Sequence, residues 1–441
     1  MKHTNISLDN NSITLKHFHS ITHHYSGPLI DRPLAFVLIL LLLPCLLLNT
    51  VIALLTKKNI FICQQKTDAL GRKLELRLFS CGIWLKTAML IDICLGKVGF
   101  CGIPLTHRVS PEIQVAAANQ LYSKAGIFSL YDLHVRTGLT VTSKEKLLEQ
   151  QLNGTFTDYL SLIVKSYLCI IFYGPTINKL QKEKNISLFG LKIKNTSMDE
   201  AVNWITTSHE QQHKTQIGFF VNVHSINLSI NDSKFFEQLS KANALFADGS
   251  GMRLAAKKAG FLLKGNNNGT DMLPHLCKRS IEKNQSLYFL GAQPGVAQKA
   301  ANELRTQFPG LNIVGTEHGY TEINSSEINN TEADNSDRII AAINESGCDV
   351  LLVAMGSPMQ EKWLLEHRDQ LQCKTALAVG GLFDFYSGNI SRSPMWLREV
   401  GMEWVWRLMQ EPKTKFNRYV IGNPLFLYRT YFLGLANRGV K

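Results

Sequence analysis

The sequence lacks the patterns that mark several common protein classes. Charged residues make up only 19% of its 441 residues and hydrophobic residues 45%, a balance that excludes disordered and collagen-like chains. The nine cysteines are odd in number and include no Cys-x-x-Cys, which argues against a disulfide framework or a structural zinc site. No zinc-finger spacing or nucleic-acid recognition motif is present, so nucleic acid is not an expected partner.

The positive charge of the chain lies at its two ends. The net charge is +12, of which +7 falls in residues 1–175, −1 in 176–391 and +6 in 392–441. A neutral body between basic ends indicates an anionic partner such as a membrane surface. We therefore expect four regions: a polar flexible tail (1–30), a membrane-associated module (31–175), a catalytic core (176–391) and a basic, aromatic C-terminal appendage (392–441).

The run from Pro33 to Thr56 contains no charged residue and is long enough to enter a bilayer. Pro44 interrupts the run where it removes a helix hydrogen bond, which permits a kink. Arg32 precedes the run and Lys57 and Lys58 follow it, and positive residues prefer the cytoplasmic side of a membrane. The pattern favours a re-entrant helix over a spanning one, although a spanning helix tolerates proline.

The N-terminal half resembles the bacterial sugar transferases, which load a sugar phosphate onto polyprenol phosphate. The resemblance rests on Asp31-Arg32-Pro33 with the apolar run, on residues 61–80, and on Gly96–Pro104, and it covers about 31–175. That family uses an Asp-Glu pair as its catalytic centre, whereas here only Asp92 remains in a shortened stretch. The resemblance implies a small α/β remnant that docks at the membrane without activity of its own. A bifunctional enzyme whose first half is also an active sugar phosphotransferase is the alternative.

From about residue 185 short apolar segments alternate with amphipathic ones. This alternation predicts an α/β fold, with a parallel sheet covered by helices on both faces. Ligands of such sheets bind beyond the carboxyl ends of the strands, so polar residues at those positions are site candidates. The expected strands are 217–223, 286–291, 311–315, 349–355 and 375–381, with helices over 293–308 and 358–370.

Six polar or glycine-containing turns follow these segments. Glycines at such turns let the backbone approach a phosphate, and helix N-termini attract anions, so the set indicates a nucleotide-type ligand. The G-x-G-x-x-G fingerprint, a Walker lysine motif and D-x-D are all absent. We therefore expect a site without cofactor or metal, in which Asp248 is the candidate base. The turns are 222–227, 248–251, 269–271, 291–292, 356–361 and 380–384.

The C-terminal half also resembles a known family, the WecG/TagA/CpsF glycosyltransferases. The resemblance covers about 185–425 and rests on residues 246–260, 269–277, 353–363 and 378–412. It implies a Rossmann-like sheet with a helical C-terminal appendage. It also implies transfer from a UDP-sugar, of N-acetylmannosamine or N-acetylmannosaminuronic acid type, to an undecaprenyl-diphosphate-linked saccharide. Such a reaction serves exopolysaccharide, capsule or surface glycan synthesis at the cytoplasmic side of the bacterial inner membrane. The resemblance is compatible with either a monomer or a homo-oligomer.

The resemblance assigns roles to particular residues. Asp248 is the expected general base, which would deprotonate the acceptor hydroxyl for an inverting attack, and a turn aspartate is the alternative. Asn266 stands where relatives often have arginine, and Lys264 could supply that charge from nearby. Two of the binding candidates, Asp271 and Asp384, could instead cap helices or turns. The expected substrate-binding residues are Asn222, His224, Asp271, Gln360, Asp384, Arg407 and Arg418.

Overall fold

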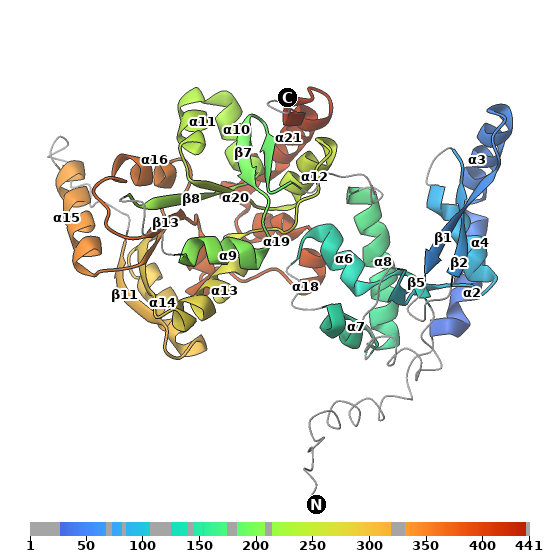
Figure 1. The fold of residues 1–441 in the computed structure, drawn as a ribbon, viewed down its shortest axis with the longest axis horizontal. Coiled ribbons are helices and arrows are strands. Elements are labelled where there is room, and N and C mark those ends of the chain that lie inside the picture. Colours follow the sequence, from blue (N-terminus) through green and yellow to red (C-terminus); the bar gives the residue numbers. More distant parts are fainter. Residues whose placement is uncertain are drawn as a thin grey trace, which may run out of the picture. The chain divides into compact units, whose positions relative to one another are not determined.

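The chain forms two compact units, which are described separately (Figure 1). Unit 1 comprises Met1–Arg136 with Val141–Gly174, and unit 2 comprises Thr137–Thr140 with Pro175–Lys441. Residues 1–26, which make up most of the expected polar tail, lie outside the described residues. The computed structural model describes residues 27–67, 73–81, 85–105, 125–139, 144–152, 154–173, 183–207, 214–318 and 331–437.

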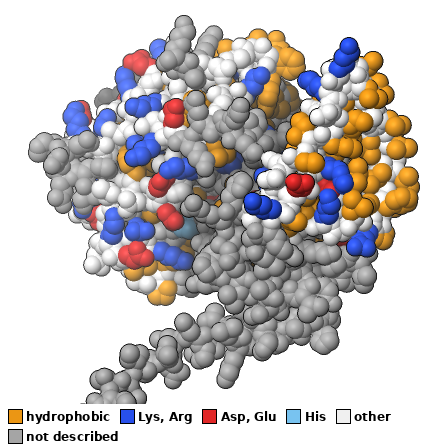
Figure 2. All heavy atoms as spheres, turned by 45° about the vertical axis from the view of Figure 1, so that its right-hand side comes forward, with side chains coloured by type: hydrophobic (Ala, Val, Ile, Leu, Met, Phe, Trp, Pro, Cys, Tyr) orange, Lys and Arg blue, Asp and Glu red, His pale blue; other side chains and the backbone are white. Residues whose placement is uncertain are grey.

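Unit 1 begins with a bent pair of apolar helices, α2 (Gly27–Leu41) and α3 (Leu43–Leu55). Pro44 lies in the first turn of α3, where its missing N–H breaks no helix hydrogen bond. No single helix in the described part is long and apolar enough to cross a membrane, but this pair, bent by 67°, meets those criteria together. Their apolar side chains remain exposed, Leu41 by 70% and Leu55 by 78%. Figure 2 shows apolar side chains gathered on the side where these helices lie.

The rest of unit 1 is a small mixed α/β module. An antiparallel hairpin joins β1 (Phe61–Thr67) to β2 (Lys73–Phe79). A second, parallel sheet has the order β3-β5-β4. The remaining elements are η1 (Leu85–Ala88), α4 (Met89–Cys94), β3 (Gly99–Cys101), β4 (Ile103–Pro104), β5 (Ala125–Phe128), α6 (Leu130–Thr137), α7 (Lys144–Leu152) and α8 (Phe156–Tyr173).

Asp92, the single acidic residue left near the expected catalytic pair of unit 1, lies on α4 and is fully buried. The backbone N–H and the guanidinium of Arg77 each donate to one of its carboxylate oxygens at 2.7 Å. The ammonium of Lys97 lies 3.5 Å from the carboxylate. A buried carboxylate needs partners, and here both of its oxygens have them, so Asp92 has a structural role.

Unit 2 is built on an eight-stranded sheet of order β11-β10-β12-β13-β8-β9-β7-β6. All of its strand pairs are parallel except β6–β7, which confirms the predicted parallel sheet. The central strands are buried along their whole length, as their continuous apolar sequences require. The strands are β6 (Asn185–Leu188), β7 (Leu191–Lys194), β8 (Gln216–Val221), β9 (Ala244–Ala247), β10 (Ser286–Gly291), β11 (Asn312–Glu317), β12 (Val350–Ala354) and β13 (Thr375–Ala378).

Helices cover both faces of this sheet, also as predicted (Figure 1). Along β12, Leu351 and Val353 enter one core while Leu352 and Ala354 enter the other. On the first face lie α10 (Val223–Asn231), α11 (Ser233–Ser240), α12 (Ser250–Lys258), α15 (Thr331–Glu345) and α16 (Met359–Glu366). On the second lie α9 (Met198–Thr206), α13 (Gly269–Glu282), α14 (Val296–Gln307) and α17 (Leu382–Tyr386).

The C-terminal segment is helical and packs on the core of unit 2. Asn227 on α10 donates to the carbonyl of Gly422 at 2.8 Å, and Arg429 donates to the Asn227 side chain at 2.9 Å. Phe426 is 1% exposed and belongs to the first core. The segment consists of α18 (Met395–Glu399), α19 (Glu403–Gln410), α20 (Pro412–Phe416), the π-helical turn η2 (Asn417–Ile421), α21 (Gly422–Tyr431) and η3 (Leu435–Asn437).

Candidate active site

Asp248 and Asn222 meet at the carboxyl edge of the sheet because they follow the neighbouring parallel strands β9 and β8. The side-chain amide of Asn222 donates to the Asp248 carboxylate at 3.3 Å. Its amide oxygen accepts from the backbone N–H groups of His224 (3.0 Å) and Ser225 (3.2 Å), so Asn222 also caps α10. The cap therefore holds the amide in the orientation that contacts Asp248.

The surroundings of Asp248 raise the pKa of its carboxyl to about 6. Burial is the main cause and the nearby charge of Asp271 adds to it, while the Asn222 hydrogen bond and the charge of Arg418 oppose it. A carboxyl with a pKa of about 6 is ionised at neutral pH and is a stronger base than an ordinary aspartate. This is the range that suits a general base.

The turn after Asp248 is shaped by Gly249 and Asn266. Gly249 has φ of +89°, a conformation that favours glycine, and its N–H donates to the Asn266 side chain at 2.6 Å. The Lys264 ammonium, by contrast, pairs with Glu200 at 2.7 Å near the surface. The Lys264 ammonium therefore already has a carboxylate partner, and a charge from it to the site stays a prediction.

His224 and Arg418 lie near each other at this edge. Burial, together with the positive charges of Arg418 and Lys415, lowers the pKa of the His224 imidazole to about 4. His224 is therefore neutral at physiological pH and offers one donor and one acceptor nitrogen. Arg418 also influences Asp248, so the structure brings Arg418 within electrostatic reach of both His224 and Asp248.

Asp384 and Arg407 form a second group beside the turn that follows β13. Burial raises the pKa of the Asp384 carboxyl, and Arg407 opposes that shift. The Arg407 guanidinium stacks 4.7 Å from the Phe385 ring centroid and pairs with Glu411 at 2.9 Å. Among the described residues, Nη1 of Arg407 has no hydrogen-bond partner although it is buried. This donor is available to an anionic ligand.

Gln360 has a supporting position in the structure. Its side-chain oxygen accepts from the backbone N–H of Gly380 at 2.9 Å, and its amide donates to Glu361 at 3.0 Å and Ser357 at 3.4 Å. The side chain thereby links the turn after β12 to the turn after β13. Because protein groups use both ends of this amide, its direct contact with substrate stays a prediction.

Asp271 joins the C-terminal segment to α13. Asn268, not Asp271, is the N-cap of this helix, since its side-chain oxygen accepts from the Asp271 N–H at 2.7 Å. The guanidinium of Arg392 donates to the Asp271 carboxylate, and that of Arg398 lies 3.7 Å from it. The capping alternative was wrong. Substrate contact by Asp271 stays a prediction, and the structure gives the carboxylate two arginine partners instead.

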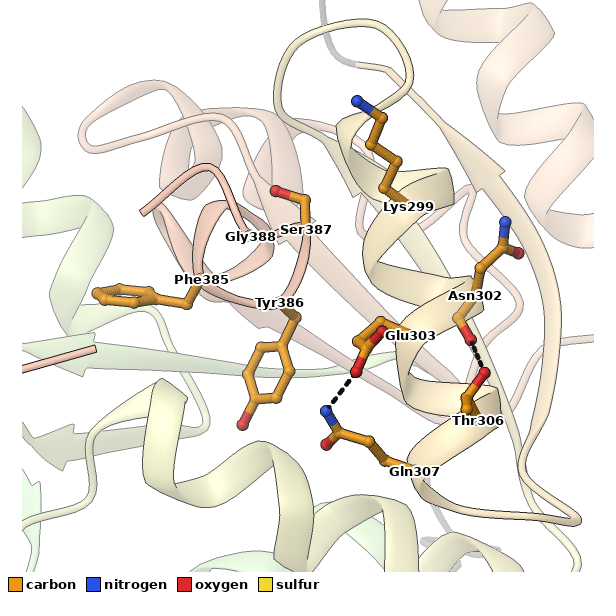
Figure 3. Close-up of a pocket in the computed structure, with 9 residues that line it drawn as sticks. All are labelled: Lys299, Asn302, Glu303, Thr306, Gln307, Phe385, Tyr386, Ser387 and Gly388. Carbon is orange, nitrogen blue, oxygen red and sulfur yellow. Dashed lines mark hydrogen bonds between the residues drawn. The ribbon is translucent and has the colours of Figure 1, made fainter. Parts of the chain in front are cut away.

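An open groove of about 560 Å³ lies between α14 and the end of α17 (Figure 3). On its α14 wall, Gln307 donates to Glu303 at 2.8 Å, and the two side chains lie near Tyr386 on the opposite wall. None of the predicted site residues lines the groove. It is lined by Lys299, Asn302, Glu303, Thr306, Gln307, Phe385, Tyr386, Ser387 and Gly388.

Sequence reasoning missed several residues that the C-terminal segment brings to this edge. Glu403 and Tyr419 both respond to the charge of Asp248, and Arg392 bonds to Asp271. These residues are 144 to 171 positions away from Asp248 along the chain. Only the folding of the segment onto the core brings them together, and no local pattern carries that information.

The fold and the site define a doubly wound α/β enzyme, with a half-buried carboxylate and several arginines at the carboxyl edge of its sheet. The model of the WecG/TagA/CpsF glycosyl transferase family matches residues 186–439, more than half of the chain. The chain therefore belongs to this family and is a glycosyltransferase, as the sequence motifs predicted.

Curated relatives agree with this assignment. Over 220 residues the chain is 24% identical to the N-acetylglucosaminyldiphosphoundecaprenol N-acetyl-beta-D-mannosaminyltransferase of Bacillus subtilis, a match that covers 49% of this chain and 80% of the relative. It is also 24% identical over 268 residues to the enzyme of the same name from Staphylococcus aureus, covering 60% of this chain and 98% of the relative.

Proposed function

We propose that this protein transfers an N-acetylmannosamine-type sugar from a UDP donor to an undecaprenyl-diphosphate-linked saccharide, as a step in surface glycan synthesis. The observation that carries the proposal is Asp248, a carboxylate of raised pKa at the ligand-binding edge of the sheet, next to Asn222 and within reach of Arg418. The names of the curated relatives supply the sugar and the acceptor class.

In the proposed reaction Asp248 removes the proton from the acceptor hydroxyl as its oxygen attacks the anomeric carbon. The new C–O bond forms on the face opposite the departing UDP, so the configuration at that carbon inverts. Arg407 and Arg418 would stabilise the negative charge that develops on the diphosphate. Neutral His224 and Asn222 would orient the donor and acceptor groups around Asp248.

The acceptor is a lipid, and we propose that both ends of the chain attach it to the membrane. The α2–α3 pair would insert its exposed apolar side chains, such as Leu41 and Leu55. The C-terminal segment exposes Phe432 by 82% and Tyr428 by 50%, and its basic residues would attract anionic lipid. This arrangement would place the site at the cytoplasmic side of the inner membrane.

We propose that unit 1 has no transferase activity of its own. A nucleophilic carboxylate must reach its substrate, whereas Asp92 is buried and bonded to Arg77 and Lys97. The bifunctional alternative therefore has no free carboxylate at this position.

The test is an assay of the purified full chain with UDP-N-acetylmannosamine, UDP-N-acetylmannosaminuronic acid and UDP-N-acetylglucosamine, each in the presence of EDTA. The acceptor would be N-acetylglucosaminyl-diphosphoundecaprenol. We expect a disaccharide-lipid with inverted configuration from the first donor. Absence of product from all three donors, or activity that requires added magnesium or manganese, would reject the proposal as stated.

A further inference from the structure

A charged cluster beside Asp248 takes no part in the proposed proton transfer. At its centre is Arg392, whose guanidinium donates to the Asp271 carboxylate and, at 3.4 Å, to the carbonyl of Thr270. The Nε atom of Arg392 lies 3.9 Å from the Glu403 carboxylate. One arginine of the C-terminal segment thus stands between a carboxylate on α13 and a carboxylate on α19.

Both of these carboxylates act on Asp248. The charge of Asp271 raises the pKa of Asp248, and the pKa of Glu403 is raised by burial and, in smaller part, by Asp271 and Asp248. The side chains of Arg392, Asp271 and Glu403 are each less than one third exposed, so water screens their charges only in part. Arg392 is the group that contacts both carboxylates.

The other groups that act on Asp248 come from two further elements. Asn222, the cap of α10, donates a hydrogen bond to it, and Arg418 on η2 lowers its pKa. Tyr419 on η2 is also close enough for Asp248 to raise the pKa of its hydroxyl. The charge at Asp248 therefore depends on a balance in which Arg392 offsets Asp271 and Glu403, with Arg398 on α18 as a second, more distant cation 3.7 Å from Asp271.

We propose that Arg392 is a positioning residue for the general base: by neutralising Asp271 and Glu403 it keeps Asp248 ionised and keeps the C-terminal segment docked beside it. The inference rests on the proposed function of Asp248. Without Arg392, Asp271 would keep only Arg398 at 3.7 Å and Glu403 would lose the nearer of its two arginines. More negative charge would then face Asp248, and its carboxyl would retain its proton to a higher pH.

The proposal predicts shifts of opposite sign in the pH dependence of turnover. Arg392→Gln should move the midpoint of the acidic limb of the kcat profile upward by about half a pH unit. This is the shift that the loss of one nearby, partly screened charge produces. Glu403→Gln should move the limb downward, because it removes a negative charge. The midpoint of the double variant should lie near that of the wild type. A residue that only holds the fold together would lower kcat at every pH and leave the midpoint in place.

The experiment measures kcat against pH for the full-length wild type, both single variants and the double variant. Arg429→Gln is the matched control, because this arginine of the same segment bonds to Asn227 and Asn231 instead, and its midpoint should not move. Arg392→Lys keeps the charge and should restore the midpoint if Arg392→Gln folds poorly. Midpoints that stay in place, or move in the same direction in both single variants, would overturn the inference.

A second readout separates this inference from the proposed function. A carboxyl titration of ¹³C-aspartate-labelled protein, with Asp248 assigned by comparison with Asp248→Asn, needs no transferase activity. The titration midpoints of the Asp248 carboxyl in the wild type and the variants should follow the same order as the midpoints of the kcat profiles. If the wild type titrates in this way yet makes no product, the proposed function fails and the role of Arg392 in the ionisation of Asp248 stands. If the wild type is active but the midpoints do not differ, the inference alone fails.

Discussion

At the scale of the residue, Asp248 shows how a functional group can oppose stability. Its folded-state pKa of about 6 lies above the ordinary aspartate value of about 3.9. Below the ordinary value the carboxyl is protonated in both states, and the protonated form favours the fold. As the pH rises through 6 that advantage is lost, so the ionised carboxylate weakens the fold at neutral pH.

Asp248→Asn should therefore stabilise the protein at pH 7.5 while it removes the base. We expect a gain of about 1 kcal/mol in the free energy of unfolding, reduced for the partial exposure of the side chain. Urea denaturation of the wild type and the variant at pH 7.5 and at pH 4.5 would measure it. The gain should shrink at the lower pH, where the wild-type carboxyl is largely protonated. A variant that is less stable at pH 7.5 would show that Asp248 is a structural residue.

At the scale of the element, strands within longer apolar runs were predictable and most short strands were not. Residues 217–223 and 349–355 were predicted because each carries an apolar run. β8 overlaps the first range and β12 lies within the second. The missed strands β6, β7 and β9 have four residues each. β13 is equally short but was predicted within 375–381, where Val379 extends its apolar run. The site was predictable where it follows a strand, as Asp248 does. The site was not predictable where the C-terminal segment folds back onto the core, as it does at Glu403.

Docking of the C-terminal segment should depend on Phe426. This ring is buried against Phe189 at 5.4 Å between centroids, so Phe426→Ala should cost about 3–5 kcal/mol of stability. Hydrogen exchange in residues 392–437 should become faster than in the rest of unit 2. Phe432→Ala is the matched control, since its ring is 82% exposed and its removal should change stability by less than about 0.5 kcal/mol. Equal protection of the segment in both variants would contradict the docking account.

At the scale of the whole molecule, the chain combines a glycosyltransferase with an apolar helix pair that precedes it. The net charge of +12 and the exposed apolar side chains of α2 and α3 suit two physically different modes of attachment to a membrane. Apolar insertion is insensitive to salt, whereas attraction to anionic lipid weakens as the ionic strength rises.

Leu41→Asp combined with Leu55→Asp should release the full chain from membranes in a high-salt wash that leaves the wild type bound. Each introduced charge costs about 2.5–3.5 kcal/mol at the centre of a bilayer helix and less near its ends. Both leucines are exposed, by 70% and 78%, so the fold should tolerate the change, which circular dichroism would verify. Membrane sedimentation before and after a wash in about 1 M NaCl, where the screening length is roughly 3 Å, gives the answer. Retention of the double variant after the wash would exclude insertion through this pair.

The account depends most on Asp248 as the base of a sugar transfer, and one paired measurement tests it directly. Turnover of UDP-N-acetylmannosamine with the lipid-diphosphate acceptor would be compared between the full-length wild type and Asp248→Asn, with UDP binding measured on the same samples by calorimetry. The account predicts a loss of turnover of about 10²–10⁴-fold, the usual contribution of a positioned base, with UDP affinity nearly unchanged. Near-normal turnover in the variant, with UDP still bound, would contradict it.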